Sequence, residues 1–209
     1  MAARRDVKEA CVREALKIIE SKGVEQLSLR QVARRLRLSH QAPYKHFASK
    51  DHILAEIIRR GFAKFAEYLQ RDPKTPNPRR NMRLLGKAYI RFALDYPLYY
   101  RLMFSSPHPN PRQHREMAEH SLASFIILRD RLQELSDAMG AGMNAEEEAF
   151  FVWSTMHGLA SMLVWDHIGG LHINGQPLTD SVRRRRIVHV LNRIGDGLRG
   201  AMLRRFPPG

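Results

Sequence analysis

The 209-residue chain is poor in cysteine and in acidic side chains. Its one cysteine, Cys11, excludes an internal disulfide framework, and 21 Asp and Glu stand against 35 Lys and Arg, for a formal net charge of +14. The longest nearly apolar run, 149–165, is shorter than the roughly 18–20 residues of a membrane span, and it contains polar side chains. The N-terminus lacks an apolar signal region. We therefore predict a cytoplasmic protein with no membrane span and a polyanionic partner.

Several kinds of chemical motif are also missing. The sequence contains no His-Glu-x-x-His motif, no histidine pair four residues apart and no cysteine pair, so we predict no metal site and no cofactor. It contains no nucleophile elbow, no phosphate-binding loop and no evident pair of catalytic carboxylates. These absences argue against an enzyme.

Proline and glycine divide the chain into helical stretches. The breakers gather at Asp72–Pro78, Ser105–Gln113 and Gly169–Asp180, and apolar residues between them recur every three or four positions. No convincing run of alternating β-branched residues appears. The pattern predicts a nearly all-α fold. We expect a first domain over residues 1–50, a linking helix over 50–71 and a second domain over 72–209, with the joint at the Pro-rich segment.

Candidate capping residues predict where the helices begin and end. Ser28 with Gln31 resembles a capping box that opens a helix over 29–36, and Gly23 ends the helix before it. The other predicted N-terminal caps are Asp6 (with Glu9), Ser39 for a short helix over 40–46, Ser49 (with Asp51), Asn144 (with Glu147), and Thr179 or Asp180.

The helices predicted over 29–36 and 40–46 are joined by about three residues, which is the spacing of a helix-turn-helix. One face of the second helix is then exposed. It carries side chains that can donate to phosphates or reach base edges in a major groove, namely His40, Gln41, Ala42, Tyr44, Lys45 and His46. Arg30, Arg37 and Lys50 add positive charge around this unit.

The stretch Leu27–Leu54, LSLRQVARRLRLSHQAPYKHFASKDHIL, resembles the DNA-binding domain of TetR-type transcriptional regulators. The resemblance covers about residues 6–60. It implies a three-helix DNA-binding domain, a helical C-terminal domain, a homodimer on a palindromic double-stranded operator, and repression that a small molecule releases. It further implies phosphate contacts by Ser28, Arg30, Tyr44, His46 and Lys50, with Lys45 and Ser39 in the same contact segment, and base contacts by His40, Gln41 and Ala42.

Several positions of this segment carry a second interpretation. Tyr44 and His46 are alternatively half-buried braces for Phe47, and Pro43 either packs against the first helix of the motif or touches a thymine methyl. Arg37 stands where the family usually has glycine. Either Arg37 adopts a positive φ, at a cost of about 1 kcal/mol, or the turn has a different conformation from that of the family. Gln41 and Ala42 replace residues that are usually small and hydroxylated, respectively, which affects the sequence preference.

In the second half, PLYYRLMF (97–104) and WSTMHG (153–158) resemble a TetR subclass with a Trp-x-x-x-His-Gly signature. The family pattern places the dimer interface on helices over 145–167 and 180–204, for which we select Leu163, Ile187, Leu191, Ile194 and Leu198. The abundance of aromatic and sulfur side chains predicts a pocket for an apolar or aromatic ligand, or an ordinary core. The candidate ligand residues are Tyr89, Phe92, Met103, Phe104, Met117, His120, Phe125, Trp153, Met156 and His157.

Three functions compete at this point. The first is a dimeric, ligand-responsive DNA-binding regulator, most simply a repressor. The second is a helical enzyme, which no catalytic motif in the sequence supports. The third is a constitutive basic nucleic-acid-binding protein without an effector. The run Arg183–Arg186 lies far along the chain from the helix-turn-helix, and we interpret it as a solvated face or as an interface ion-pair partner.

Overall fold

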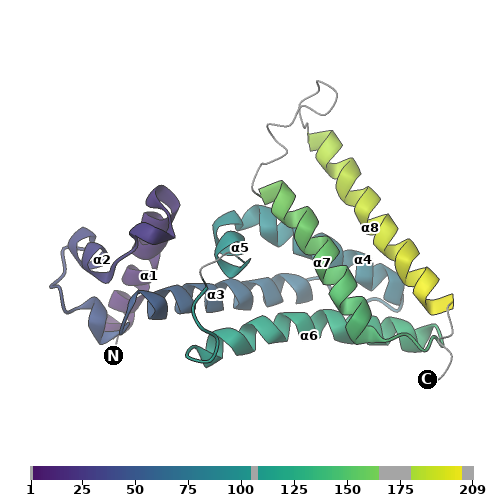
Figure 1. Cartoon of the computed structure of the whole chain (residues 1–209), viewed down its shortest axis with the longest axis horizontal. Helices are drawn as coiled ribbons and strands as arrows, with labels where there is room; N and C mark the ends of the chain where they lie inside the picture. Colours follow the sequence, from purple (N-terminus) through teal and green to yellow (C-terminus); the bar gives the residue numbers. More distant parts are fainter. Residues whose placement is uncertain (1, 105–107, 165–179, 204–209) are drawn as a thin grey trace. The chain divides into compact units, whose positions relative to one another are not determined.

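The computed structural model describes residues 2–104, 108–164 and 180–203, and over these residues the chain is all-helical (Figure 1). Its elements are α1 (Ala2–Lys22), η1 (Val24–Gln26), α2 (Leu29–Arg35), η2 (Pro43–Lys45), α3 (Lys50–Gln70), α4 (Pro78–Asp95), α5 (Pro97–Phe104), α6 (Arg115–Ala138), α7 (Ala145–Val164) and α8 (Asp180–Leu203). The predicted all-α fold class is confirmed.

The chain forms two compact units. Unit 1 contains residues up to Ala63 together with Leu102–Ser121, and unit 2 contains Lys64–Arg101 and the residues from Leu122 onward. Helices α3, α5 and α6 therefore each contribute residues to both units. The predicted helix break over 72–78 is present as the connection between α3 and α4, where Pro78 occupies the first turn and the Asn77 side chain accepts from the Arg80 amide at 3.1 Å.

The core of unit 1 is formed by the apolar faces of α1, α2 and α3. Buried side chains include Ile18 on α1, Val32 on α2, and Ile53 and Ile57 on α3, each with no exposed surface. The spacing of three and four along α3 places these apolar positions on one face, as predicted. This small core holds α2 and the segment that follows it in a fixed geometry.

The core of unit 2 centres on Phe65. Its ring centroid lies 5.0 Å from those of Tyr89 and Phe92 and 6.1 Å from that of Trp153. The pairs with Tyr89 and Trp153 are edge-to-face, an arrangement that adds to the stabilisation from burial alone. Helix α4 packs against α7 and α8, and α7 packs against α8.

Two predictions about local structure are corrected. Helix α1 begins at Ala2, so Asp6 lies inside the helix and is not its N-cap. The first helix does end at Gly23, which has a φ of 83° and whose amide bonds the Ile19 carbonyl at 2.8 Å. The segment 40–46 is not an α-helix. The first part is a turn and Pro43–Lys45 forms a 3₁₀ turn.

Candidate functional site

Helix α2 is fixed at both ends by hydrogen bonds that its sequence specifies. The Ser28 hydroxyl accepts from the Gln31 amide at 3.2 Å, as the predicted cap requires. At the other end Arg37 has a φ of 55°, and it is the one non-glycine residue with a positive φ in the part of the chain that the structure describes. The Leu38 amide bonds the Ala33 carbonyl at 2.9 Å and the Arg37 amide bonds the Arg34 carbonyl at 3.2 Å. This is a Schellman ending in which arginine occupies the position that glycine favours.

Pro43 explains why the next segment is a tight turn. Proline has no amide hydrogen, and its ring disfavours an α-helix across the preceding residues. The amide of Ala42 bonds the Ser39 carbonyl at 3.0 Å and that of His46 bonds the Pro43 carbonyl at 2.9 Å, both over three residues. No side chain caps η2, so the predicted Ser39 cap is wrong. Pro43 is fully buried and η2 packs against α1 and α2, so the packing interpretation of this proline is confirmed.

The residues around η2 nevertheless present a polar surface. The side chains of His40, Gln41, Tyr44 and Lys45 are exposed, and the ring centroids of His40 and Tyr44 lie 5.4 Å apart. Ala42 and His46 are half-buried, and Ser28, Arg30 and Ser39 are exposed. The segment from α2 to η2 thus displays hydroxyl, amide, imidazole and ammonium groups from one compact scaffold, and these groups are suited to phosphates and base edges.

The start of α3 is tied to the same scaffold. The Lys50 ammonium donates to the Glu25 carbonyl at 3.2 Å, which links α3 to η1. Two further donors of this ammonium are available to a phosphate. The Ser49 hydroxyl accepts from the His52 amide at 3.4 Å and lies 2.9 Å from its Nδ1, so the predicted Ser49 cap is confirmed.

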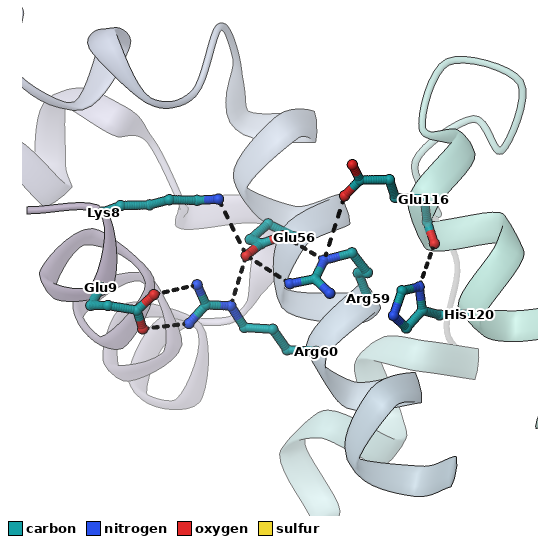
Figure 2. A network of polar contacts seen from close by, with 7 residues as sticks. All are labelled: Lys8, Glu9, Glu56, Arg59, Arg60, Glu116 and His120. Atoms are coloured by element: carbon teal, nitrogen blue, oxygen red, sulfur yellow. Dashed lines mark hydrogen bonds and ion pairs between the residues drawn. The ribbon is translucent and has the colours of Figure 1, made fainter. Parts of the chain in front are cut away.

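A network of ion pairs joins α1 to α3 (Figure 2). Arg60 donates to the two Glu9 oxygens at 2.6 and 2.7 Å and to Glu56 at 2.9 Å. Arg59 donates twice to Glu56, and Lys8 lies 3.5 Å from the same carboxylate. Burial acts to raise the pKa of Glu56, but the hydrogen bonds from Arg59 and Arg60 outweigh it and lower this pKa to about 2. The contacts of Glu9 and Lys8 with α3 join residues about fifty positions apart, so no local sequence pattern predicts them.

A second ion pair connects α1 to α2. The Arg35 Nε lies 2.5 Å from a carboxylate oxygen of Glu14, whose side chain is largely buried. Arg35 therefore helps to orient α2 on α1.

Unit 2 contains an apolar cavity of about 60 Å³ between α4, α7 and α8. Three candidate ligand residues line it, namely Tyr89, Trp153 and Met156. Three of the interface candidates line it too: Leu191, Ile194 and Leu198. Leu191 packs tightly against Gly86 of α4, where a β-carbon would stand 2.5 Å from the Cδ2 atom of Leu191. A side chain at Gly86 would therefore displace Leu191.

The other candidate ligand residues lie elsewhere. Phe92 is fully buried beside Phe65, and the Phe125 ring lies between those of Phe150 and Trp153, at centroid distances of 5.2 and 5.8 Å. Met103, Phe104, Met117 and His120 belong to unit 1. Met117 lines a second, more polar cavity of about 250 Å³ in unit 1, together with His52, Glu56, Arg59 and His114 among others.

His157 ends a chain of hydroxyl groups in unit 2. The hydroxyl oxygens of Tyr89 and Tyr100 are 3.3 Å apart, and that of Tyr100 lies 2.7 Å from Nδ1 of His157. Ser161 lies 3.4 Å from the other ring nitrogen. Burial raises the pKa of Tyr100 to about 12 and lowers the pKa of His157, because burial disfavours the charged form of each side chain. The sequence singled out His157 but not this partner.

The remaining interface candidates lie on the last two helices. Leu163 and Ile187 are half-buried. The large apolar side chains that are exposed on α7 and α8 are instead Phe150, Phe151, Met162 and Val188, which the sequence analysis did not select.

Comparison with protein families decides the identity of this architecture. Residues 12–57, which contain the capped α2 and η2, match the family described as bacterial regulatory proteins, tetR family, and residues 82–184 match a tetracyclin repressor-like C-terminal domain. The chain belongs to the TetR family of transcriptional regulators. It is accordingly a DNA-binding regulator and not an enzyme. No helix in the described ranges is long and apolar enough to cross a membrane. Likewise, no cluster of candidate metal ligands occurs among those residues.

Solved structures share the fold of this TetR-family chain. A protein of unknown function from Rhodococcus sp. RHA1 is 26% identical, with a TM-score of 0.72, 94% of this chain covered and 95% of the other. A TetR-family transcription regulator from Shewanella sp. PV-4 is 20% identical, with a TM-score of 0.67 and coverages of 95% and 99%. A TetR-family regulatory protein from Rhodococcus RHA1 is 16% identical, with a TM-score of 0.68 and coverages of 90% and 96%. A search of curated proteins finds no match.

Proposed function

We propose that the chain is a sequence-specific repressor that binds a palindromic operator as a homodimer and is released by a small apolar or aromatic ligand. The observation that carries this proposal is the exposed polar surface of His40, Gln41, Tyr44 and Lys45 on the rigid α2–η2 scaffold. Because its proposed partner is chromosomal DNA, we place its action in the cytoplasm.

We assign two roles within the contact segment. Ser28, Arg30, Tyr44, His46 and Lys50 bind phosphates, with Ser39 and Lys45 beside them, whereas His40, Gln41 and Ala42 face the bases. His40 and Gln41 are exposed at the start of the turn and carry groups that read base edges. The exposure of Tyr44, 39% of its surface, supports a DNA contact better than a brace for Phe47.

The experiment compares two variants on operator and on unrelated DNA over a range of salt concentrations. Lys50→Ala should weaken binding to both DNAs and reduce the salt slope by about one unit, because a phosphate contact is lost. Gln41→Ala should alter base preference, by about 1–3 kcal/mol for a good base contact. Lys87→Ala is the matched control, an exposed lysine on α4 of unit 2. A change of preference in Lys50→Ala but not in Gln41→Ala would reverse the assigned roles.

We place the dimer interface on α7 and α8. Phe150, Met162 and Val188 are each more than half exposed, and such large apolar side chains on neighbouring helices favour a protein partner. A dimer also doubles the operator sequence that one short contact segment reads. Sedimentation of the chain at micromolar concentration should give a dimer, and a monomer would contradict the proposal.

We place the effector in the apolar cavity of unit 2, and we assign the C-terminal domain to the Trp-x-x-x-His-Gly subclass. Trp153 and His157 lie one turn apart on α7, the first lining the cavity and the second bonded to Tyr100. No charged side chain lines the cavity, which favours uncharged ligands. At about 60 Å³ it must widen to hold a drug-sized molecule, and this requirement offers a route from ligand binding to movement of α7 or α8.

A thermal-shift screen of uncharged aromatic and aliphatic compounds tests this placement. Stabilising compounds should lose their effect in Met156→Ala or Trp153→Ala and should weaken operator binding by the wild type. Compounds that bind but leave operator affinity unchanged would contradict release by ligand. Equal binding of operator and unrelated DNA, with no responsive compound, would favour a constitutive basic nucleic-acid-binding protein.

A further inference from the structure

The exposed face of α7 has an acidic end and an apolar middle. Its exposed positions recur every three or four residues and comprise Glu146, Glu147, Phe150, Phe151, Ser154, Gly158 and Met162. The side chains are small at the centre of this row, at Ser154 and Gly158, and a β-carbon on Gly158 would meet open space. A second helix can therefore approach the middle of α7 closely.

Helix α8 extends the same face and carries positive charge at the end that lies away from the acidic residues of α7. The two helices run antiparallel (Figure 1), and the Phe151 ring lies 3.4 Å from the β-carbon position of Gly197. This register places Arg184 and Arg185 beside the C-terminal end of α7. They lie about 25 Å along the helices from the level of Glu147, at a rise of 1.5 Å per residue. Within one chain the two charged groups are too far apart to pair.

These four charged groups have no compensating partner among the described residues. Arg184, Arg185, Glu146 and Glu147 are exposed and form no ion pair within the described residues. Arginines in the first two turns of α8 also face the positive end of the helix dipole, which disfavours them, whereas the two glutamates of α7 occupy a favourable end. An external acidic group would offset the cost at Arg184 and Arg185.

We propose that the external group is the acidic end of a second copy of this chain. We place a two-fold axis perpendicular to the helices, through the small residues at the middle of α7. This axis sets the acidic end of the face of one copy against the basic end of the face of the other copy. It brings Arg184 and Arg185 of each copy opposite Glu146 and Glu147 of the other, while Phe150, Met162 and Val188 meet between them. This inference rests on the proposed homodimer and adds its orientation and its charge pairing, and it gives the arginine run a role.

Charge reversal tests the pairing directly by sedimentation. Arg184→Glu/Arg185→Glu and Glu146→Lys/Glu147→Lys should each raise the dimer dissociation constant about tenfold or more, because symmetry places like charges together at two sites. An equimolar mixture of these two variants should form heterodimers near wild-type affinity, because both contact sites then carry opposite charges. A misfolded variant would gain nothing from mixing. Arg83→Glu/Lys87→Glu is a control of equal charge change on exposed α4 positions.

The outcomes separate this inference from the proposed function. A wild type that sediments as a monomer overturns both. A wild-type dimer whose affinity neither reversal changes leaves the dimer in place and overturns the pairing. Loss of DNA affinity in Arg184→Glu/Arg185→Glu with unchanged dimerisation assigns the run to nucleic acid and likewise overturns the pairing. Weakening by each reversal with rescue in the mixture supports it.

Discussion

Replacing Arg37 with glycine should stabilise the protein. Arg37 holds a φ of 55° at the end of α2, a conformation that costs a residue with a β-carbon about 1 kcal/mol or slightly more. Glycine adopts this φ without that cost, although it loses more backbone entropy on folding. The hydrogen bonds of the Schellman ending use backbone atoms only, so the substitution keeps them. The net expectation is a gain of about 0.5–1 kcal/mol.

Arg34→Gly provides a control with the same change of charge and side chain. Arg34 is exposed within α2, where glycine costs about 1 kcal/mol relative to a good helix former. The two variants should therefore shift in opposite directions. A gain of 1 kcal/mol corresponds to a rise of about 2–4 °C in Tm for a chain of this size. Urea and thermal unfolding followed by circular dichroism measure the difference, and equal destabilisation by both substitutions would refute the conformational argument.

Three further predictions follow from the polar contacts. Glu56→Gln should cost about 2 kcal/mol, because Arg59 and Arg60 lose a charged acceptor, and urea titration measures it. Because the pKa of Glu56 is lowered from 4.5 to about 2, the contribution of this carboxylate to the free energy of unfolding is complete above pH 4.5 and declines towards pH 2. Glu56→Gln should therefore make the stability less dependent on pH between 4.5 and 2, and an unchanged dependence would contradict this role of Glu56. Burial, and then the charge of His52, lower the pKa of His114 from 6.5. The contribution of neutral His114 to the stability of unit 1 should therefore be complete above pH 6.5 and decrease progressively below it. Melting curves recorded at a series of pH values should lose this dependence in His114→Asn.

Local sequence signals predicted the elements around the site well. Ser28, Ser49 and Asn144 cap the helices that they were expected to cap, because capping depends on a side chain and an amide only two or three residues away. The positive φ of Arg37 was one of the two outcomes expected for a non-glycine residue in that turn. The prediction of an α-helix over 40–46 was wrong, because Pro43 and the packing of η2 favour a 3₁₀ turn over an α-helix.

Contacts between distant residues were beyond the sequence patterns. Aromatic and methionine content indicated apolar surroundings but could not assign Met103 and Met117 to unit 1 and Trp153 and Met156 to the cavity of unit 2. Ile194 and Leu198 were selected for the dimer interface, but the structure buries both side chains within their own chain, which helix periodicity alone could not show. The bonds of Glu9 to Arg60 and of Tyr100 to His157 depend on tertiary geometry alone.

Nuclease footprinting on the DNA that flanks the protein's own gene tests the central claim most directly. The account predicts a short, two-fold symmetric protected site whose half-sites lie about one helical turn apart or slightly more. Protection should weaken steeply with salt and disappear when His40 and Gln41 are both replaced by alanine. A protected region without two-fold symmetry, or even protection of the DNA regardless of its sequence, would contradict a dimeric operator-binding regulator.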